Sequence, residues 1–189
     1  MAKKKTPKRG GAKPTTRRSA PKRAAKPTRK SAAKRAAAPA AAAGAGKVTP
    51  YLCVKGGAAA LDFYKKAFGA IELMRIAGKD GSIGHADIEI EGAQIFVSDE
   101  WPEGGVFSPQ TLGGSPVSIH LYVRDVDDFA ARALKAGASE VRAVADQPYG
   151  DRSGTLRDPF GHRWMVASKK EEVSKEEMER RFGGAYLVT

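Results

Sequence analysis

Several short stretches of the chain alternate polar and apolar side chains, and the polar members can bind or activate a small molecule. His85 alternates with apolar residues in residues 84–90, and His120 and Tyr122 do so in residues 117–123. Because the side chains of a β-strand point alternately to its two faces, such strands bury one face and expose a polar one. A fully solvated face would be richer in Lys, Glu and Thr, so we predict a concave ligand-binding cup.

The predicted ligand-binding residues combine aromatic rings, which supply apolar contact, with imidazole, hydroxyl and guanidinium groups, which fix the orientation of a ligand. They are Tyr51, His85, Phe96, Ser98, Ser118, His120, Tyr122, Arg152 and Arg163. Arg152 could clamp an anionic ligand with both arms of its guanidinium. The alternative is an ion pair with Asp146, Asp151 or Asp158, and the sequence leaves both open.

Other catalytic groups are sparse in the sequence. Asp99 and Glu100 follow a predicted strand, and a carboxylate pair can act as general base and general acid. The alternative is that the pair only forms a turn. Neither Ser98 nor Ser118 stands in a context that indicates an activated nucleophile. Whether the protein is an enzyme is therefore left open.

The elements that position these residues occur twice. Leu52 and Leu121 lie 69 residues apart, and the glycines that end the two predicted helices, Gly69 and Gly137, lie 68 apart. Each copy reads as a strand, a helix and three further strands, which predicts an α+β fold built by duplication. The first copy comprises a strand at 49–54, a helix at 58–68 and strands at 71–76, 84–90 and 93–98. The second comprises a strand at 117–123, a helix at 126–136 capped by Asp125, and strands at 140–145, 153–157 and 162–167. Residues 99–116 are the connection.

Charge separates residues 1–47 from the rest of the chain. They hold 16 Lys and Arg and no Asp or Glu, whereas residues 48–189 hold 17 basic and 21 acidic residues. Because it has no aromatic, Leu or Ile side chain to bury and only one Met, this Lys/Ala/Pro-rich tail is predicted to be disordered. A flexible polybasic segment attracts phosphates without reading bases, so we predict non-specific association with nucleic acid. Other polyanions, membrane surfaces and an import signal are the alternatives, and the Lys richness argues against import.

The remaining residues suit one domain, which we place at 48–168 with modules at about 48–98 and 117–168. Residues 169–189 are predicted to add a short charged helix, with Ser174 and Glu177 as a capping box. Cys53 is the only cysteine, which excludes an internal disulfide and favours a reducing compartment, so we predict a cytoplasmic protein. No stretch approaches the ~20 apolar residues that a membrane span requires.

The two copies, the helix LDFYKKAFG and the ending RDPFGHRWMV together resemble the vicinal oxygen chelate superfamily of glyoxalase I, extradiol dioxygenases and bleomycin-binding proteins. The segments IGHADIEIEGAQIFVSDEWPEG and YGDRSGTLRDPFGHRW are most similar to the branch named after a phosphonate-operon protein or a demethylubiquinone methyltransferase. The resemblance implies two βαβββ modules that form one U-shaped cup of eight strands, frequently within a homodimer.

Metal-dependent members of that superfamily hold their ion from the first and last strands of each module. The matching positions here are Thr49, Phe96, Ser118 and Met165, none of which is His or Glu. Because a divalent ion needs imidazole and carboxylate ligands, we predict no metal and no cofactor. A displaced site of His85 and His120 with Asp87 or Glu89 is the alternative, and would indicate a metal-dependent lyase, isomerase or dioxygenase. The leading prediction is a non-metal protein, forming a homodimer, that binds a small organic molecule.

Overall fold

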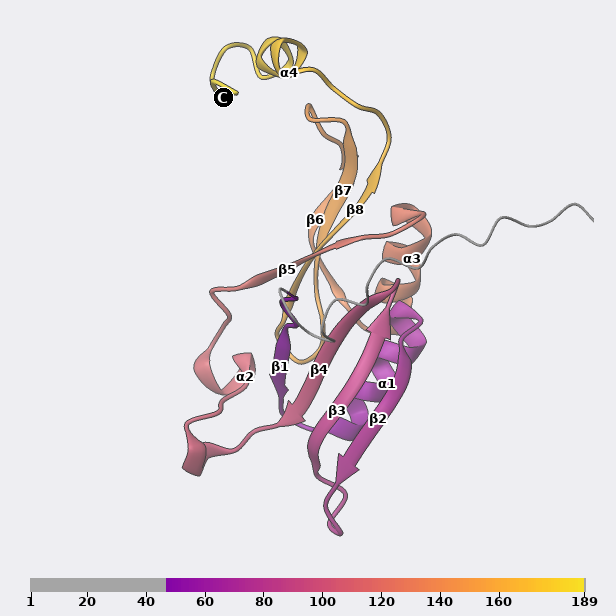
Figure 1. Cartoon of the computed structure of the whole chain (residues 1–189), viewed down its shortest axis with the longest axis vertical. Coiled ribbons are helices and arrows are strands. Elements are labelled where there is room, and N and C mark those ends of the chain that lie inside the picture. Colours follow the sequence, from indigo (N-terminus) through magenta and orange to yellow (C-terminus); the bar gives the residue numbers. More distant parts are fainter. Residues whose placement is uncertain (1–46, 189) are drawn as a thin grey trace, which may run out of the picture. The chain divides into compact units, whose positions relative to one another are not determined.

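The computed structural model describes residues 47–188 and confirms an α+β fold of two βαβββ modules (Figure 1). The predictions of a disordered, nucleic-acid-binding tail concern residues that lie outside this range, apart from Lys47. The first module comprises β1 (Tyr51–Val54), α1 (Gly57–Phe68), β2 (Ile71–Ala77), β3 (Ile83–Ile90) and β4 (Ala93–Asp99). The second comprises β5 (Ser118–Tyr122), α3 (Val126–Ala136), β6 (Ser139–Asp146), β7 (Asp151–Arg157) and β8 (Arg163–Lys169).

The eight strands form two four-stranded sheets with the same topology. The strand orders are β1-β4-β3-β2 and β5-β8-β7-β6, with the first pair of each sheet parallel and the other pairs antiparallel. The bounds agree with the predicted elements to within two residues, and α3 has the predicted bounds because Asp125 accepts a hydrogen bond from the Asp128 amide and Gly137 adopts φ 117°. The duplication read from the sequence is therefore a duplication of the sheet.

The connection between the modules is more ordered than the sequence indicates. It contains a 3-10 turn, η1 (Pro102–Gly104), and a short helix, α2 (Pro109–Leu112). The Ser108 hydroxyl caps α2 by accepting from the Thr111 amide at 3.3 Å. Trp101 and Val106 exchange two backbone hydrogen bonds of 2.9 and 3.0 Å, which close the loop around η1. These contacts hold the loop next to the end of β4.

Helices α1 and α3 pack against each other, and each also lies against its own sheet. Phe68 stacks on Phe129 with ring centroids 5.0 Å apart and an interplanar angle of 20°. Trp164, on the helix side of β8, contacts Tyr64 and Phe68 of α1 at centroid distances of 5.8 and 4.8 Å. Figure 1 shows α1 behind the first sheet and beside α3. The two modules therefore share one hydrophobic core.

A buried carboxylate joins the modules inside this core. Asp158, in the β7–β8 turn, is 3% exposed, and its Oδ2 accepts from the Tyr64 hydroxyl at 2.8 Å and from the Trp164 indole at 3.0 Å. Its Oδ1 accepts from the amides of Phe160 and His162, both at 2.9 Å. Burial, together with the Asp158 charge, raises the pKa of Tyr64 well above its usual value. His162 Nε2 also lies 2.9 Å from the Cys53 carbonyl, which links the β7–β8 turn to β1.

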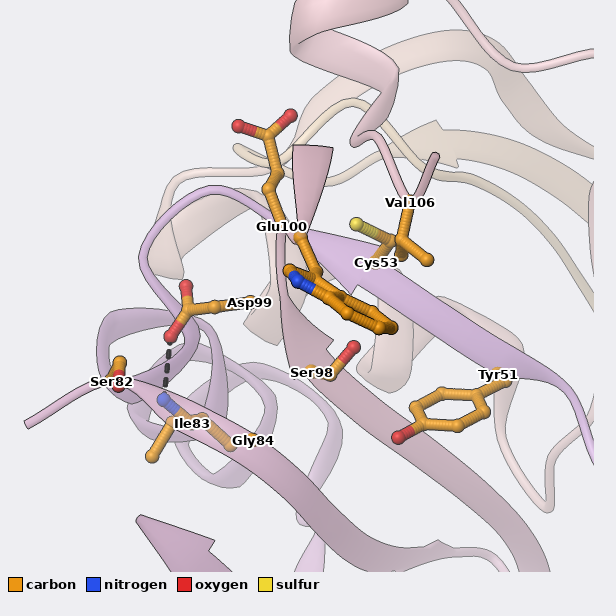
Figure 2. A pocket seen from close by; sticks show the side chains of 10 residues that line it. Tyr51, Cys53, Ser82, Ile83, Gly84, Ser98, Asp99, Glu100 and Val106 are labelled. Atoms are coloured by element: carbon orange, nitrogen blue, oxygen red, sulfur yellow. Dashed lines mark hydrogen bonds between the residues drawn. The ribbon is translucent and has the colours of Figure 1, made fainter. Parts of the chain in front are cut away.

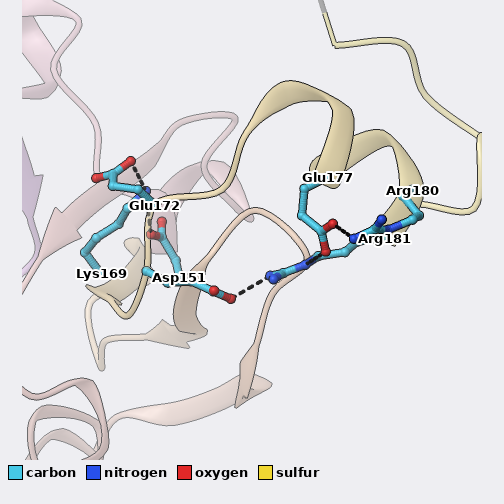
Figure 3. A network of polar contacts seen from close by, with 7 residues as sticks. Asp151, Lys169, Glu172, Glu177, Arg180 and Arg181 are labelled. Carbon is cyan, nitrogen blue, oxygen red and sulfur yellow. Dashed lines mark hydrogen bonds and ion pairs between the residues drawn. The ribbon is translucent and has the colours of Figure 1, made fainter.

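The C-terminal segment carries α4 (Lys175–Arg181) and an ion-pair network (Figure 3). Ser174 caps the helix by accepting from the Glu177 amide at 3.2 Å. The Glu177 carboxylate binds Arg180 and Arg181, so only half of the predicted capping box forms. Within residues 47–188, no helix has the length and apolar character that a bilayer crossing requires.

Candidate ligand-binding site

Because one side of each sheet lies in the shared core, the polar sides of the two sheets turn away from that core. We name the polar side of β1–β4, which carries Tyr51, His85, Asp87, Glu89 and Phe96, the sheet-1 face. We name the polar side of β5–β8, which carries Ser118, His120, Tyr122, Met165 and Arg163, the sheet-2 face. Eight of the nine predicted ligand-binding residues divide equally between these faces, with Ser98 of β4 as the fourth on the sheet-1 face. Arg152 lies apart from both groups.

The sheet-1 face brings three predicted residues into one aromatic cluster. Tyr51 and Phe96 are register partners on β1 and β4, with ring centroids 5.6 Å apart. His85 on β3 lies edge-on to both, at 5.4 Å from Tyr51 and 4.9 Å from Phe96. The Tyr51 hydroxyl is 2.8 Å from His85 Nδ1, so the phenol and the imidazole fix each other's orientation. This cluster follows from period-two alternation on adjacent strands.

A cavity of about 620 Å³ lies beside this cluster at the end of β4 (Figure 2). The predicted residues Tyr51 and Ser98 line it, together with the half-buried Cys53. The connection contributes Trp101 and Val106, which sequence reasoning did not assign to the site. The remaining lining residues are Ser82, Ile83, Gly84, Asp99 and Glu100. The volume lies within the range of about 300–1,000 Å³ that small-molecule sites occupy.

The Cys53 thiol in this cavity is a weak nucleophile at neutral pH. Burial is the main cause that raises its pKa to about 11, and the negative charges of Glu100 and Asp99 raise it further. Because the thiolate is the reactive form, Cys53 stays protonated and unreactive near pH 7. Cys53 therefore serves the cavity as a small side chain of β1.

The carboxylate pair beside the cavity is held by backbone amides. Asp99 accepts from the amides of Gly56 and Gly57 through Oδ1 at 2.9 and 2.6 Å, and from the Ile83 amide through Oδ2 at 2.7 Å. Glu100 accepts from the Ser108 amide at 2.8 Å. Hydrogen bonding from Thr111 and Ser108 lowers the pKa of Glu100 to about 2. Glu100 is therefore ionised at neutral pH and holds no proton to donate, which favours a structural role for the pair over acid–base catalysis.

The sheet-2 face carries a second polar cluster. The rings of His120 and Tyr122 are 4.9 Å apart, and the Tyr122 hydroxyl donates to Asp151 Oδ2 at 2.9 Å. This hydrogen bond raises the pKa of Tyr122. Asp151 is only 3% exposed, and its Oδ1 lies 3.8 Å from Lys169 Nζ. Sequence reasoning missed Asp151 because it began the strand at Ser153; two more residues of alternation would have included it.

The last three predicted residues have different surroundings. Ser118 and Arg163 are register partners and both are exposed on the sheet-2 face. Arg152 donates to both oxygens of Asp127 at 2.7 Å and to Asp146 at 3.2 Å. These contacts lower the pKa of Asp127 and raise that of Arg152. Arg152 therefore forms ion pairs, and its guanidinium is occupied by carboxylates. Asp146 was one of the three partners predicted for it, whereas Asp127, its main partner, was not.

The positions that hold a metal in metal-dependent relatives do not fit a metal here. Phe96 belongs to the aromatic cluster, and Met165 is the register partner of His120. A divalent ion requires imidazole and carboxylate ligands. None of Thr49, Phe96, Ser118 and Met165 supplies one. Among residues 47–188, no three His, Cys, Asp or Glu side chains cluster in a way that could hold an ion.

Comparison with known proteins adds family and fold. The model of the Glyoxalase/Bleomycin resistance protein/Dioxygenase superfamily matches residues 44–166. An uncharacterized protein of Mycobacterium tuberculosis is 45% identical over 135 residues, which cover 70% of this chain and 79% of the relative. One of Arabidopsis thaliana is 32% identical over 127 residues, covering 64% of this chain and 76% of the relative.

Solved structures show the same architecture. TioX from Micromonospora sp. ML1 matches with a TM-score of 0.53 and 26% identity, over 68% of this chain and 99% of TioX. An Arabidopsis thaliana gene product matches with a TM-score of 0.52 and 30% identity, over 64% and 97% of the two chains. A fosfomycin resistance protein from Listeria monocytogenes, solved with Mn(II) and sulfate, shares the fold with a TM-score of 0.50 at 19% identity, over 73% and 98%.

Proposed function

This chain belongs to the Glyoxalase/Bleomycin resistance protein/Dioxygenase superfamily, and we propose that it binds a small organic molecule without a metal ion, in a cup lined by its βαβββ modules. The observation that carries this proposal is the cavity of about 620 Å³ beside Tyr51, His85 and Phe96. Its aromatic walls, Tyr51 and Trp101, can bury the apolar part of a ligand, while the Tyr51 hydroxyl, which His85 orients, offers a fixed polar group.

A fragment screen on the full-length protein tests this proposal. Fragments that raise the melting temperature should also perturb the NMR signals of the cavity residues, and Tyr51→Ala should abolish both effects. Tyr186→Ala is the matched control, because Tyr186 is exposed to a similar degree, 64% against 55%, but lies in the C-terminal segment. Fragments that bind Tyr51→Ala and the unmodified protein equally would place the ligand elsewhere.

The non-metal part of the proposal has its own test. We expect elemental analysis to find no stoichiometric Ni, Zn, Mn or Fe, either as purified or after loading with each metal. The competing function is that of a metal-dependent lyase, isomerase or dioxygenase. One equivalent of metal that is lost in His85→Ala or His120→Ala would establish that alternative.

We further propose that a second copy of the chain completes the cup. The sheet-1 face carries the acidic Asp87 and Glu89, whereas the sheet-2 face carries the basic Arg157 and Arg163, together with Lys169, which lies next to Asp151. Since the two faces of one chain turn away from the shared core, opposite charges can meet only when the sheet-1 face of one copy approaches the sheet-2 face of another. A two-fold axis would form two such cups in a homodimer.

The edge strand of the first sheet supports the same proposal. On β2, the four large apolar side chains Ile71, Leu73, Met74 and Ile76 are 44–59% exposed, and such a patch marks a protein contact. We expect sedimentation equilibrium to give a dimer for the full-length protein and a folded monomer for Ile76→Lys. Leu187→Lys, which adds the same charge at a side chain that is 86% exposed outside the sheets, should remain dimeric. A dimer that survives Ile76→Lys would argue against this interface.

For residues 1–47 we propose non-specific association with nucleic acid, carried by their 16 Lys and Arg and the absence of Asp and Glu. If about half of these cations engage phosphates, the log–log salt slope should be on the order of −7. Fluorescence anisotropy with two unrelated duplexes, comparing the full-length protein with residues 48–189, measures this slope. Equal binding by both proteins, or binding indifferent to salt, would remove the nucleic-acid role.

The domain boundary and the cellular compartment complete the proposal. Residues 48–189 should unfold cooperatively without the tail, because the hydrophobic core formed by the described residues 47–188 begins at Leu52. Circular dichroism of this fragment on heating measures the transition, and its loss would mean that the boundary is misplaced. The single, protonated Cys53 is compatible with the cytoplasm, where fractionation of the native host should find the protein.

A further inference from the structure

The cavity beside Trp101 is lined by aromatic and acidic side chains, and no Lys, Arg or His is among its lining residues within 47–188. We propose that this cavity binds organic cations that carry an aromatic ring, such as aryl-alkyl ammonium ions, in preference to anions. The proposal rests on the proposed function, since it specifies the chemical class of the part of the ligand that enters this cavity.

Two aromatic rings are available to a cation at the cavity. Trp101 is 62% exposed and Tyr51 is 55% exposed, so a large part of each side chain is left uncovered by residues 47–188. The Trp101 ring packs closely against Gly104, where an added Cβ atom would come within 2.2 Å of ring atom Cε3. The backbone hydrogen bonds with Val106 hold the same loop. A ring held in place loses little entropy when a cation binds to its face.

Two acidic side chains, Asp99 and Glu100, lie next to this aromatic wall. Asp99 and Glu100 accept hydrogen bonds mainly from neutral backbone amides, which orient the carboxylates without neutralising them. Their field reaches the cavity, because both carboxylates contribute to the raised pKa of the Cys53 thiol that lines it. Lys55 is exposed and is not among the lining residues. A concave surface of one charge sign concentrates ligands of the opposite sign.

Three probes of similar size and different charge test the preference on the full-length protein: benzyltrimethylammonium, 2-phenylethanol and phenylacetate. The chain has two tryptophans, so an NMR spectrum of the indole N–H groups should show Trp101 as the signal that Trp101→Leu removes. Trp164 is fully buried and serves as an internal control. We expect the cation to shift the Trp101 signal. Its dissociation constant should be about tenfold below that of phenylacetate, a difference of about 1.4 kcal/mol in binding free energy.

Two variants separate the aromatic from the acidic contribution. Trp101→Leu keeps an apolar side chain at an exposed position and should weaken cation binding, measured by calorimetry, about fivefold, with little effect on 2-phenylethanol. Glu100→Gln keeps an acceptor for the Ser108 amide but removes the charge, and should weaken cation binding about threefold while phenylacetate binds more tightly.

The outcomes distinguish this inference from the function on which it rests. Phenylacetate binding at Trp101 as tightly as the cation would overturn the charge preference and leave ligand binding intact. Unchanged cation affinity in both variants would also overturn the preference. If none of the three probes perturbs the cavity, the proposed binding function fails together with the preference.

Discussion

Asparagine at position 158 should destabilise the protein strongly, because four donors converge on the Asp158 carboxylate inside the core. The Tyr64 hydroxyl and the Trp164 indole donate to one oxygen, and two backbone amides of the β7–β8 turn donate to the other. In Asp158→Asn, the amide oxygen can still accept from the backbone. The amide nitrogen then faces Trp164, whose indole can only donate.

The magnitude follows from the bonds that the substitution removes. A hydrogen bond to a charged group contributes about 1.5–3 kcal/mol. Asp158→Asn removes the charge from all four bonds and leaves the Trp164 indole without an acceptor, although the Tyr64 hydroxyl can turn to accept from the new amide, so we expect a loss of about 3–5 kcal/mol. Tyr64→Phe removes one donor and leaves the carboxylate three, and should cost about 2 kcal/mol. Because the two residues share a bond, the double variant should be more stable than additivity predicts by about 1–2 kcal/mol.

Urea unfolding of the full-length protein measures these free energies, with circular dichroism and the fluorescence of the nearby Trp164 as independent probes of one transition. Asp62→Asn, at an exposed position of α1, is the control and should change stability by less than about 0.5 kcal/mol. The reasoning would be refuted by an Asp158→Asn loss below about 1 kcal/mol, or by strict additivity with Tyr64→Phe.

Three further predictions concern single sites. The rate of iodoacetamide alkylation of Cys53 should rise until about pH 11, where its pKa lies, and a plateau near pH 8 would contradict this. The pKa of Glu72 is lowered to about 2, first by hydrogen bonding to Arg75, so its contribution is present above about pH 4.5 and lost as pH falls towards 2. Glu72→Gln should cost about 1 kcal/mol or less at pH 7 in urea unfolding and nothing near pH 2, and an equal cost at both pH values would exclude this ion pair. Gly150→Ala should destabilise by about 1–3 kcal/mol, since φ is 90° and the new Cβ would lie 2.5 Å from the Glu171 carbonyl; an unchanged melting temperature would show that the segment after β8 can move away.

Local rules were enough for the elements and for part of the site. The alternation of His85 and Phe96 with buried neighbours, together with the order of the strands, predicts that their side chains share a face, and the structure puts the rings 4.9 Å apart. Helix α3 is likewise determined by its own residues, from the Asp125 cap to Gly137. The helix depends on interactions between residues a few positions apart, and the shared strand face depends on alternation at period two.

Other parts of the site depend on contacts that alternation does not describe. Arg142 reaches the sheet-2 face, where it donates to Ser153 at 3.2 Å, but β6 has register irregularities on both sides of it, and a bulge breaks the period-two pattern. Two backbone hydrogen bonds to Val106 hold Trp101 at the cavity. The composition of the loop, which is rich in Gly and Pro, does not predict these bonds.

The sequence by itself determined two βαβββ modules, each with one polar and one apolar sheet face, because the periodicities of strands and helices depend on residues that are close in the sequence. Only the tertiary structure decided how the modules meet. Phe68 stacks on Phe129, and the Asp158 carboxylate ties α1 to the β7–β8 turn, so the helices lie within one core and the polar faces turn away from it. Periodicity says which side of a strand is buried, but the partner that buries it is chosen by packing between distant residues.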